Sequence, residues 1–175
     1  MIHKKRYISQ NEAEGLCAHI TRHVLKANIK VKAVIGIVRG GLAPAVMLSH
    51  YYGCPLYTID YSLRDRNDAQ EFSPHDSQML SLANLQTEKG GHVLIVDDIN
   101  DSGATLNWIK QDWEDSCFPG EPHWNFVWSN NVRVAVLCDN EASASELKIS
   151  YSAVDLNKAE EDCWIVFPWE DWWTK

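Results

Sequence analysis

Short runs of apolar residues, with helix-like segments between them, limit most strongly how this chain can fold. The clearest runs are AVIGIV (33–38), HVLIVDDI (92–99) and VRVAVLCD (132–139). They are rich in β-branched residues and apolar at successive positions, which is typical of strands buried on both faces of a sheet. None approaches the length needed to cross a membrane. The segments LYTIDYSL (56–63), YSAVDL (151–156) and WIVF (164–167) predict further strands.

Three segments between these runs have helical signals. Ser9 stands three residues before Glu12, which is a capping-box pattern, and apolar residues then recur at helical spacing. LAPAVMLSHYY (42–52) is followed by Gly53, a residue suited to ending a helix, and TLNWIKQDWED (105–115) predicts a third helix. The alternation predicts an α/β fold: one domain over residues 1–175, with a mainly parallel twisted sheet flanked by helices.

Composition restricts the partners and the compartment. The chain has 175 residues and a formal net charge of −8, which argues against a broad nucleic-acid or membrane surface. Its five cysteines are odd in number and form no C-x-x-C pair, so we expect no disulfide framework and no structural zinc site. A reducing, cytoplasmic setting suits this pattern.

Two loops are predicted to meet at the carboxyl edge of the sheet, where open α/β sheets bind ligands. The first is VRGGL (38–42) and the second is DDINDSGAT (97–105). In the second loop, Gly103 allows a ligand to approach the backbone, and the helix start and its hydroxyls suit a phosphate. Asp97 and Asp98 repel each other, so a fold gains nothing from them, but carboxylates accept hydrogen bonds from vicinal hydroxyls. The pattern therefore favours a sugar phosphate as ligand.

VLIVDDINDSGAT (93–105) resembles the phosphoribosyl-diphosphate (PRPP) motif of the type I phosphoribosyltransferases. CWIVFPWED (163–171) and VRGGLAPAVMLSH (38–50) are similar to segments of the xanthine–guanine and hypoxanthine–guanine members of that family. The resemblance covers roughly residues 33–60, 92–112 and 132–170, but not the irregular excursion at 116–131. It implies the type I fold and a pentosyl transferase of purine salvage, which makes a nucleoside monophosphate and diphosphate from PRPP and a purine, with Mg²⁺ as cofactor.

The resemblance also assigns residues to the PRPP site. Asp97 and Asp98 would hold the ribose hydroxyls, directly or through Mg²⁺, and Asp101 would be the general acid/base near N7 of the purine. The residues that would bind the 5′-phosphate are Ser102, Gly103, Ala104 and Thr105. Arg39 and Gly40 would bind the diphosphate, and the Val38–Arg39 peptide is expected to be cis.

On the base side, the resemblance implies stacking on Trp164 and a backbone contact near Ile165, within a base-binding segment at about 160–173. A flexible hood at about 61–91, which is long and polar, would close over the reacting centre. The purine enzymes of the family place a lysine after the strand that ends here in Asp139 and Asn140. Asn140 can donate or accept, so the sequence predicts weaker discrimination between 6-oxo and 6-amino purines, with hypoxanthine, guanine or xanthine still favoured.

Two other functions remain open at this point. One is a regulator that keeps the fold and senses PRPP without catalysis, although the net charge and Asp101 speak against it. The other is a transferase for a different acceptor, either a pyrimidine or an amine outside the nucleobases. Trp172 and Trp173 suit either packing or an oligomer interface, and a homo-oligomer is expected.

Overall fold

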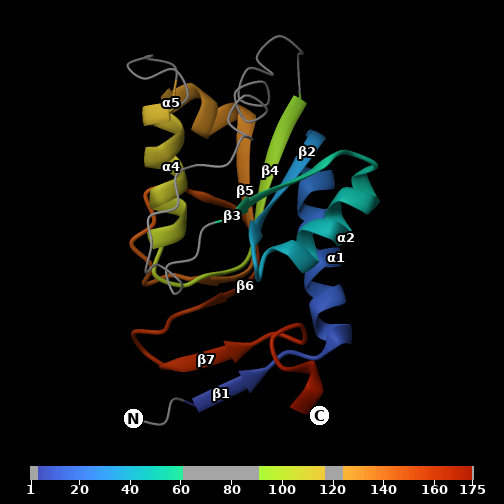
Figure 1. Cartoon of the computed structure of the whole chain (residues 1–175), viewed down its shortest axis with the longest axis vertical. Helices are drawn as coiled ribbons and strands as arrows, with labels where there is room; N and C mark the ends of the chain where they lie inside the picture. The colour runs from blue at the N-terminus through green and yellow to red at the C-terminus, as the bar shows by residue number, and fades with distance from the viewer. Residues whose placement is uncertain (1–3, 61–90, 117–123, 175) are drawn as a thin grey trace.

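Five parallel strands form the centre of the computed structural model, which describes residues 4–60, 91–116 and 124–174 (Figure 1). Their order across the sheet is β3-β2-β4-β5-β6, so β4 lies in the middle. The bounds are β2 (Lys30–Val38), β3 (Leu56–Asp60), β4 (Gly91–Asn100), β5 (Val132–Asn140) and β6 (Ile149–Leu156). The predicted single α/β domain with a parallel sheet is confirmed. The predicted hood at 61–91 lies, apart from Gly91, outside the described residues.

Helices cover both faces of the sheet (Figure 1). α1 (Gln10–Lys26) and α2 (Leu42–Tyr52) pack on one face, and α4 (Ala104–Ser116) packs on the other. The Ser9–Glu12 capping box is present, and Gly53 ends α2 in the left-handed conformation, with φ 60°. The predicted start of α1 and the predicted end of α2 are therefore confirmed.

The excursion expected to be irregular at 116–131 is helical where the structure describes it. α5 (Trp124–Phe126) leads into the π-helix η2 (Val127–Asn131). Trp128 stacks on Trp113 and on Trp124, with ring centroids 5.3 and 5.6 Å apart. This aromatic packing orders a segment whose sequence lacks helical periodicity.

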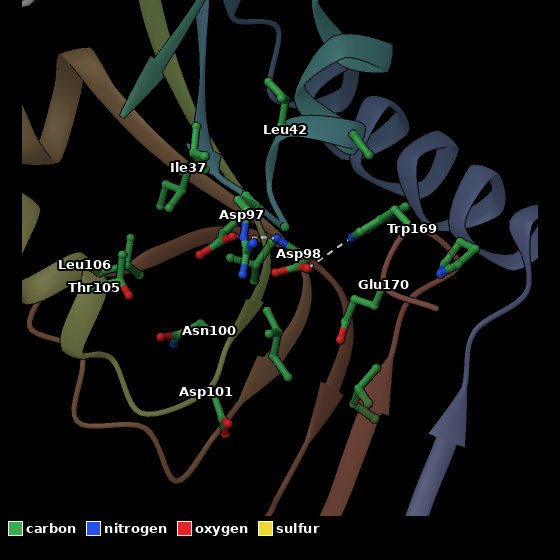
Figure 2. A pocket seen from close by; sticks show the side chains of 18 of the residues that line it. Ile37, Leu42, Asp97, Asp98, Asn100, Asp101, Thr105, Leu106, Trp169 and Glu170 are labelled. Carbon is green, nitrogen blue, oxygen red and sulfur yellow. Dashed lines mark hydrogen bonds between the residues drawn. The ribbon is translucent and has the colours of Figure 1, made fainter. Parts of the chain in front are cut away.

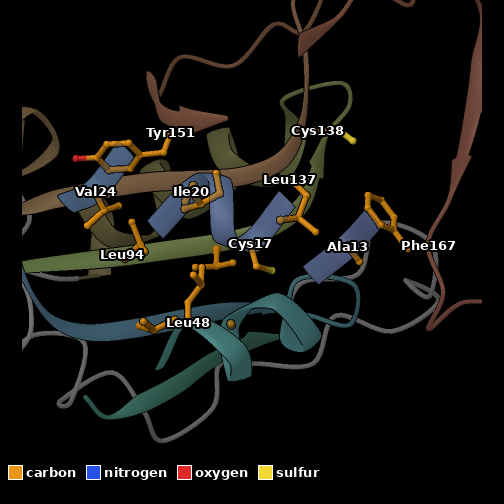
Figure 3. Packing of buried hydrophobic residues seen from close by; sticks show 14 of the residues in the cluster. Ala13, Cys17, Ile20, Val24, Leu48, Leu94, Leu137, Cys138, Tyr151 and Phe167 are labelled. Carbon is orange, nitrogen blue, oxygen red and sulfur yellow. The ribbon is translucent and has the colours of Figure 1, made fainter. Parts of the chain in front are cut away.

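Successive side chains of each strand enter two separate cores because the strand period is two residues. In β2, Ile35 and Ile37 face α4, whereas Val34 faces α1 and α2. Figure 3 shows the second core, which includes Ile20, Leu48 and Leu94 and, at the end beside Ala13, Phe167 from the C-terminal segment. No helix among the described residues is long and apolar enough to span a membrane.

A second, two-stranded sheet lies apart from the first. β1 (Lys4–Tyr7) pairs in parallel with β7 (Cys163–Val166), and the short helix η3 (Trp172–Thr174) follows (Figure 1). The predicted last strand exists, but it does not join the main sheet. The sequence did not predict β1, whose residues KKRY are all exposed. This small sheet holds Trp164 and Ile165 where they can line a cleft with the end of β4.

Candidate active site

The two predicted loops and the C-terminal segment enclose one cleft at the carboxyl edge of the sheet (Figure 2). Its volume is about 1270 Å³. The lining includes most residues that the sequence singled out: Arg39, Gly40, Asp97, Asp98, Asp101, Ser102, Gly103, Ala104, Thr105, Trp164 and Ile165. Segments that are distant in sequence therefore converge as predicted.

The VRGGL loop (38–42) and the acidic pair lie close together. A methyl group placed on Gly40 would lie 2.1 Å from Asp98 Oδ2, so a larger residue would require the Asp98 side chain to move. A methyl group on Gly41 would lie 2.4 Å from the carbonyl oxygen of Val96. The Val38–Arg39 peptide is cis, as predicted.

The adjacent carboxylates of Asp97 and Asp98 form the electronegative centre of the cleft. The Asp98 amide donates to Asp97 Oδ1 at 2.9 Å, and the Trp169 indole Nε1 donates to Asp98 Oδ2 at 3.4 Å (Figure 2). Burial, and then the charge of Asp98, raise the pKa of Asp97 well above its usual value. Burial also raises the pKa of Asp98, although its hydrogen-bond donors act in the opposite direction. A bound cation would relieve this unfavourable concentration of charge.

The donor set suits Mg²⁺. Two neighbouring carboxylates supply hard oxygen ligands, and Mg²⁺ is commonly held by one or two carboxylates together with substrate oxygens and water. The described ranges contain no group of three or more His, Cys, Asp or Glu side chains able to hold a metal alone. Asp97 and Asp98 would therefore share such an ion with oxygen atoms of a bound phosphate ester.

Gly103 fixes the shape of the loop before α4. Its φ is +84°, and an added methyl group would lie 2.3 Å from the backbone nitrogen of Ser145. α4 begins directly afterwards at Ala104, whose amide donates to Ser102 Oγ at 3.3 Å. The loop thus presents a helix N-terminus and two hydroxyl groups to the cleft, which favours an anion.

Asp139 and Asn140 have other contacts than those expected. They do not appear among the described residues that line the cleft. Asp139 accepts from the buried amide of Asn100 at 2.8 Å, which joins the ends of β4 and β5. Asn140 is buried, and its Nδ2 donates to the carbonyl oxygen of Asp101 at 2.8 Å. Its Oδ1 accepts from the amides of Ala142 and Lys158, at 3.2 and 3.0 Å. The side-chain amide assumed to read a base is thus occupied by backbone groups.

A lysine does reach the cleft, from a segment that sequence reasoning overlooked. Lys158 follows β6, and its Nζ lies 2.9 Å from Asp101 Oδ2 and 5.8 Å from the centre of the Trp164 ring. Its side chain is 14% exposed. A lysine that follows β6, rather than one at the end of β5, therefore lines the cleft. The sequence signal was a single lysine in the polar run NKAEED (157–162), which is typical of a solvated turn.

Comparison with known families identifies the relatives of this fold. The family model described as "Phosphoribosyl transferase domain" matches residues 6–170. The chain belongs to this family. The match spans both loops, β7 and the Trp169 segment, so it includes every residue that lines the cleft except Trp173.

Several curated members of the phosphoribosyltransferase family are similar to the chain. A xanthine-guanine phosphoribosyltransferase of Cereibacter sphaeroides is 29% identical over 79% of this chain and 69% of the relative. Xanthine phosphoribosyltransferase 1 of Saccharomyces cerevisiae is 22% identical over 95% and 90%. The hypoxanthine-guanine phosphoribosyltransferase of Schizosaccharomyces pombe is 25% identical over 94% and 88%.

Solved structures of the phosphoribosyltransferase family share the fold. A purine phosphoribosyltransferase from Pyrococcus horikoshii superposes with a TM-score of 0.61 at 23% identity, covering 95% of this chain and 94% of the other. A xanthine-guanine-hypoxanthine phosphoribosyltransferase from Helicobacter pylori gives a TM-score of 0.64 at 18% identity, covering 98% and 96%. These likenesses support the predicted type I architecture.

The acidic pair of this phosphoribosyltransferase-family chain is expected to lower its stability. Asp97→Asn removes one of two neighbouring charges, and the new amide oxygen can still accept from the Asp98 amide. We expect the free energy of unfolding at pH 7.5 without ligand to rise by about 1 kcal/mol. Asp155→Asn, at an exposed position, is the control and should leave it unchanged. A lower stability of Asp97→Asn in urea unfolding would contradict the expected repulsion.

Proposed function

We propose that this protein is a purine phosphoribosyltransferase that transfers the phosphoribosyl group of PRPP to N9 of a 6-oxopurine. The observation that carries the proposal is the convergence of three parts in one cleft. These are a carboxylate pair against Gly40, a helix-start loop at Gly103, and an aromatic side chain, Trp164, supplied by β7. Each part matches one portion of a sugar diphosphate and base: hydroxyls, phosphate and ring.

The sugar diphosphate is proposed to lie across the two loops. The amides and hydroxyls of residues 102–105 hold the 5′-phosphate, and Asp97 and Asp98 hold the ribose hydroxyls. Arg39 and Gly40 border the diphosphate. Mg²⁺, when bound at the carboxylate pair, supplies positive charge to the leaving diphosphate. The xanthine-guanine and hypoxanthine-guanine names of the curated relatives support this reading.

Asp101 is proposed to move the proton. As the bond from C1 of the ribose to the diphosphate breaks, positive charge develops at that carbon, and N9 of the purine supplies the electron pair for the new bond. The base meanwhile loses a proton, and a carboxylate near N7 can accept it. Asp101 lies in the loop between the acidic pair and the phosphate-binding residues, with a side chain 47% exposed towards the cleft. Trp164 supplies the stacking surface, and the backbone at Ile165 borders the base.

A nucleobase panel tests the function. The protein is incubated with PRPP, Mg²⁺ and each of hypoxanthine, guanine, xanthine, adenine, uracil and orotate, and diphosphate release is measured with nucleotide formation. We expect nucleoside monophosphates from 6-oxopurines. Binding of PRPP without transfer to any base would instead favour the sensing regulator, and transfer to a pyrimidine would contradict the purine assignment.

A further inference from the structure

We propose that Trp169 is a positioning residue of the sugar-diphosphate site, because its indole N–H holds the Asp98 carboxylate in the orientation that receives PRPP and Mg²⁺. The inference rests on the proposed function and adds a residue from outside the two loops. It starts from one contact across the cleft. Trp169 Nε1 donates to Asp98 Oδ2 at 3.4 Å, and both residues line the cleft (Figure 2).

The surroundings of the Asp98 carboxylate make its orientation depend on the protein. Asp98 is only 8% exposed, so water has little access to it. A buried carboxylate needs hydrogen-bond donors from the fold in place of water. Gly40 approaches Oδ2 so closely that an added methyl group would lie 2.1 Å from it. The oxygen that accepts from Trp169 is therefore also the one next to the VRGGL loop.

The chemistry of an indole suits the task of holding a carboxylate that must still bind a ligand. An indole N–H is only a donor, so it binds the carboxylate and does not compete for a cation. A carboxylate has several lone-pair sites, and one hydrogen bond leaves others for an ion and for ribose hydroxyls. Carboxylates that hold metals in proteins are commonly oriented by such outer hydrogen bonds. Trp169 supplies one of these bonds to Asp98.

The indole is itself fixed to the core. Trp169 stacks on the buried ring of Phe167, with ring centroids 5.0 Å apart and an angle of 6° between the planes. Residues 167–170 form a closed turn, in which the Glu170 amide donates to the Phe167 carbonyl oxygen at 3.0 Å. The Phe167 amide in turn donates to Glu170 Oε1 at 3.2 Å. A donor that is locked in this way can define the position of the carboxylate instead of following it.

The contact joins two parts of the cleft that are distant in the chain. Asp98 belongs to β4, whereas Trp169 follows β7, the strand that carries Trp164. The donor to the carboxylate and the proposed stacking surface for the base therefore belong to one segment. A displacement of this segment would reach the sugar site through Trp169 and the base site through Trp164.

Calorimetry with PRPP and Mg²⁺, in the absence of any base, tests the role of Trp169 without turnover. The variant is Trp169→Phe, which keeps an aromatic ring against Phe167 and removes the donor. We expect the dissociation constant of PRPP to rise by about 10- to 100-fold. Trp128→Phe is the matched control, because Trp128 Nε1 also donates to a carboxylate, that of Glu114, at 2.9 Å, within the tryptophan cluster around η2. It should keep the wild-type affinity, and urea unfolding of both variants measures the structural cost that they share.

The indole resonances of the wild type provide a second measurement. A ¹H–¹⁵N spectrum resolves the indole groups, and the Trp169 peak is the one missing from Trp169→Phe or, if that variant does not fold, from Trp169→Tyr. Addition of PRPP with Mg²⁺ should move the Trp169 indole proton upfield, because a carboxylate that shares its charge with an ion is a weaker acceptor. The Trp128 peak should stay in place.

The outcomes separate this inference from the proposed function. An unchanged PRPP dissociation constant in Trp169→Phe, or a Trp169 peak that does not respond, overturns the role of Trp169 and leaves the transferase intact. A wild type that binds PRPP but transfers its phosphoribosyl group to no base overturns the proposed function alone, since the effect of Trp169 is measured on binding. A wild type that does not bind PRPP overturns both.

Discussion

Gly103→Ala is expected to lower both the stability of the protein and its affinity for PRPP. The residue has a φ of +84°, and its new methyl group would lie 2.3 Å from the Ser145 nitrogen. Backbone atoms cannot rotate away as a flexible side chain can, so the loop or the Ser145 segment must shift. We expect a loss of about 2–4 kcal/mol in the free energy of unfolding and a rise of at least about tenfold in the KM for PRPP.

Gly15→Ala is the matched control for Gly103→Ala. Gly15 lies inside α1, and an added methyl group meets no atom within 4 Å. Alanine favours a helix interior over glycine, so this variant should gain about 0.5–1 kcal/mol and keep the wild-type KM. Urea unfolding and steady-state kinetics on both variants measure the contrast. A Gly103→Ala protein as stable as the wild type would refute the tight packing of the phosphate loop.

Asp101→Asn is expected to reduce kcat by about 10²-fold or more, with little change in the dissociation constant of PRPP. An amide cannot take up the proton that the base loses during transfer. Its oxygen can still accept from Lys158, so the lysine is held as before. The variant thus separates proton transfer from the contact with Lys158.

Asp115→Asn provides the comparison for Asp101→Asn. Asp115 is exposed near the end of α4 and accepts from Gln111 Nε2 at 2.7 Å, away from the cleft. Its replacement should leave kcat unchanged. The measurements are kcat by diphosphate release and PRPP affinity by calorimetry. A kcat within about threefold of the wild type in Asp101→Asn would assign the proton transfer to another group.

The sequence was sufficient to predict the elements whose local sequence patterns agree with their burial in the fold. The sequence of β4 predicts a buried strand because both faces of β4 enter a core. The residues DSGAT, which follow the acidic pair at the end of β4, mark the start of α4. Ser9 and Glu12 mark the start of α1 because capping depends on neighbours only. β1 was missed because four exposed residues carry no apolar period, and its strand conformation depends on pairing with β7. The helices α5 and η2 were missed because stacking between tryptophans orders them.

The PRPP side of the cleft could be predicted better than the base side for a similar reason. Residues 97–105 are continuous in sequence, so their spacing already describes the geometry of the loop. On the proposed base side, Lys158 and Asp101 meet although they are distant in sequence, and the Asn140 side chain connects their backbones. Hydrogen bonds between distant segments leave no spacing pattern in one sequence. Asn140 therefore looked available for a ligand, and Lys158 looked like part of a solvated turn.

The pairing of β1 with β7 affects the order in which the chain can fold as it is made. β2, β4 and α4, which carry the VRGGL and DDINDSGAT loops, are synthesised before β7. β7, which carries Trp164, pairs with residues 4–7, which precede the whole main sheet in the chain. Closing so long a stretch of chain is slow compared with local folding. The β1–β7 sheet is therefore assembled after the main sheet, and a nascent chain stalled after β6 would have the 97–105 loop without Trp164 beside it.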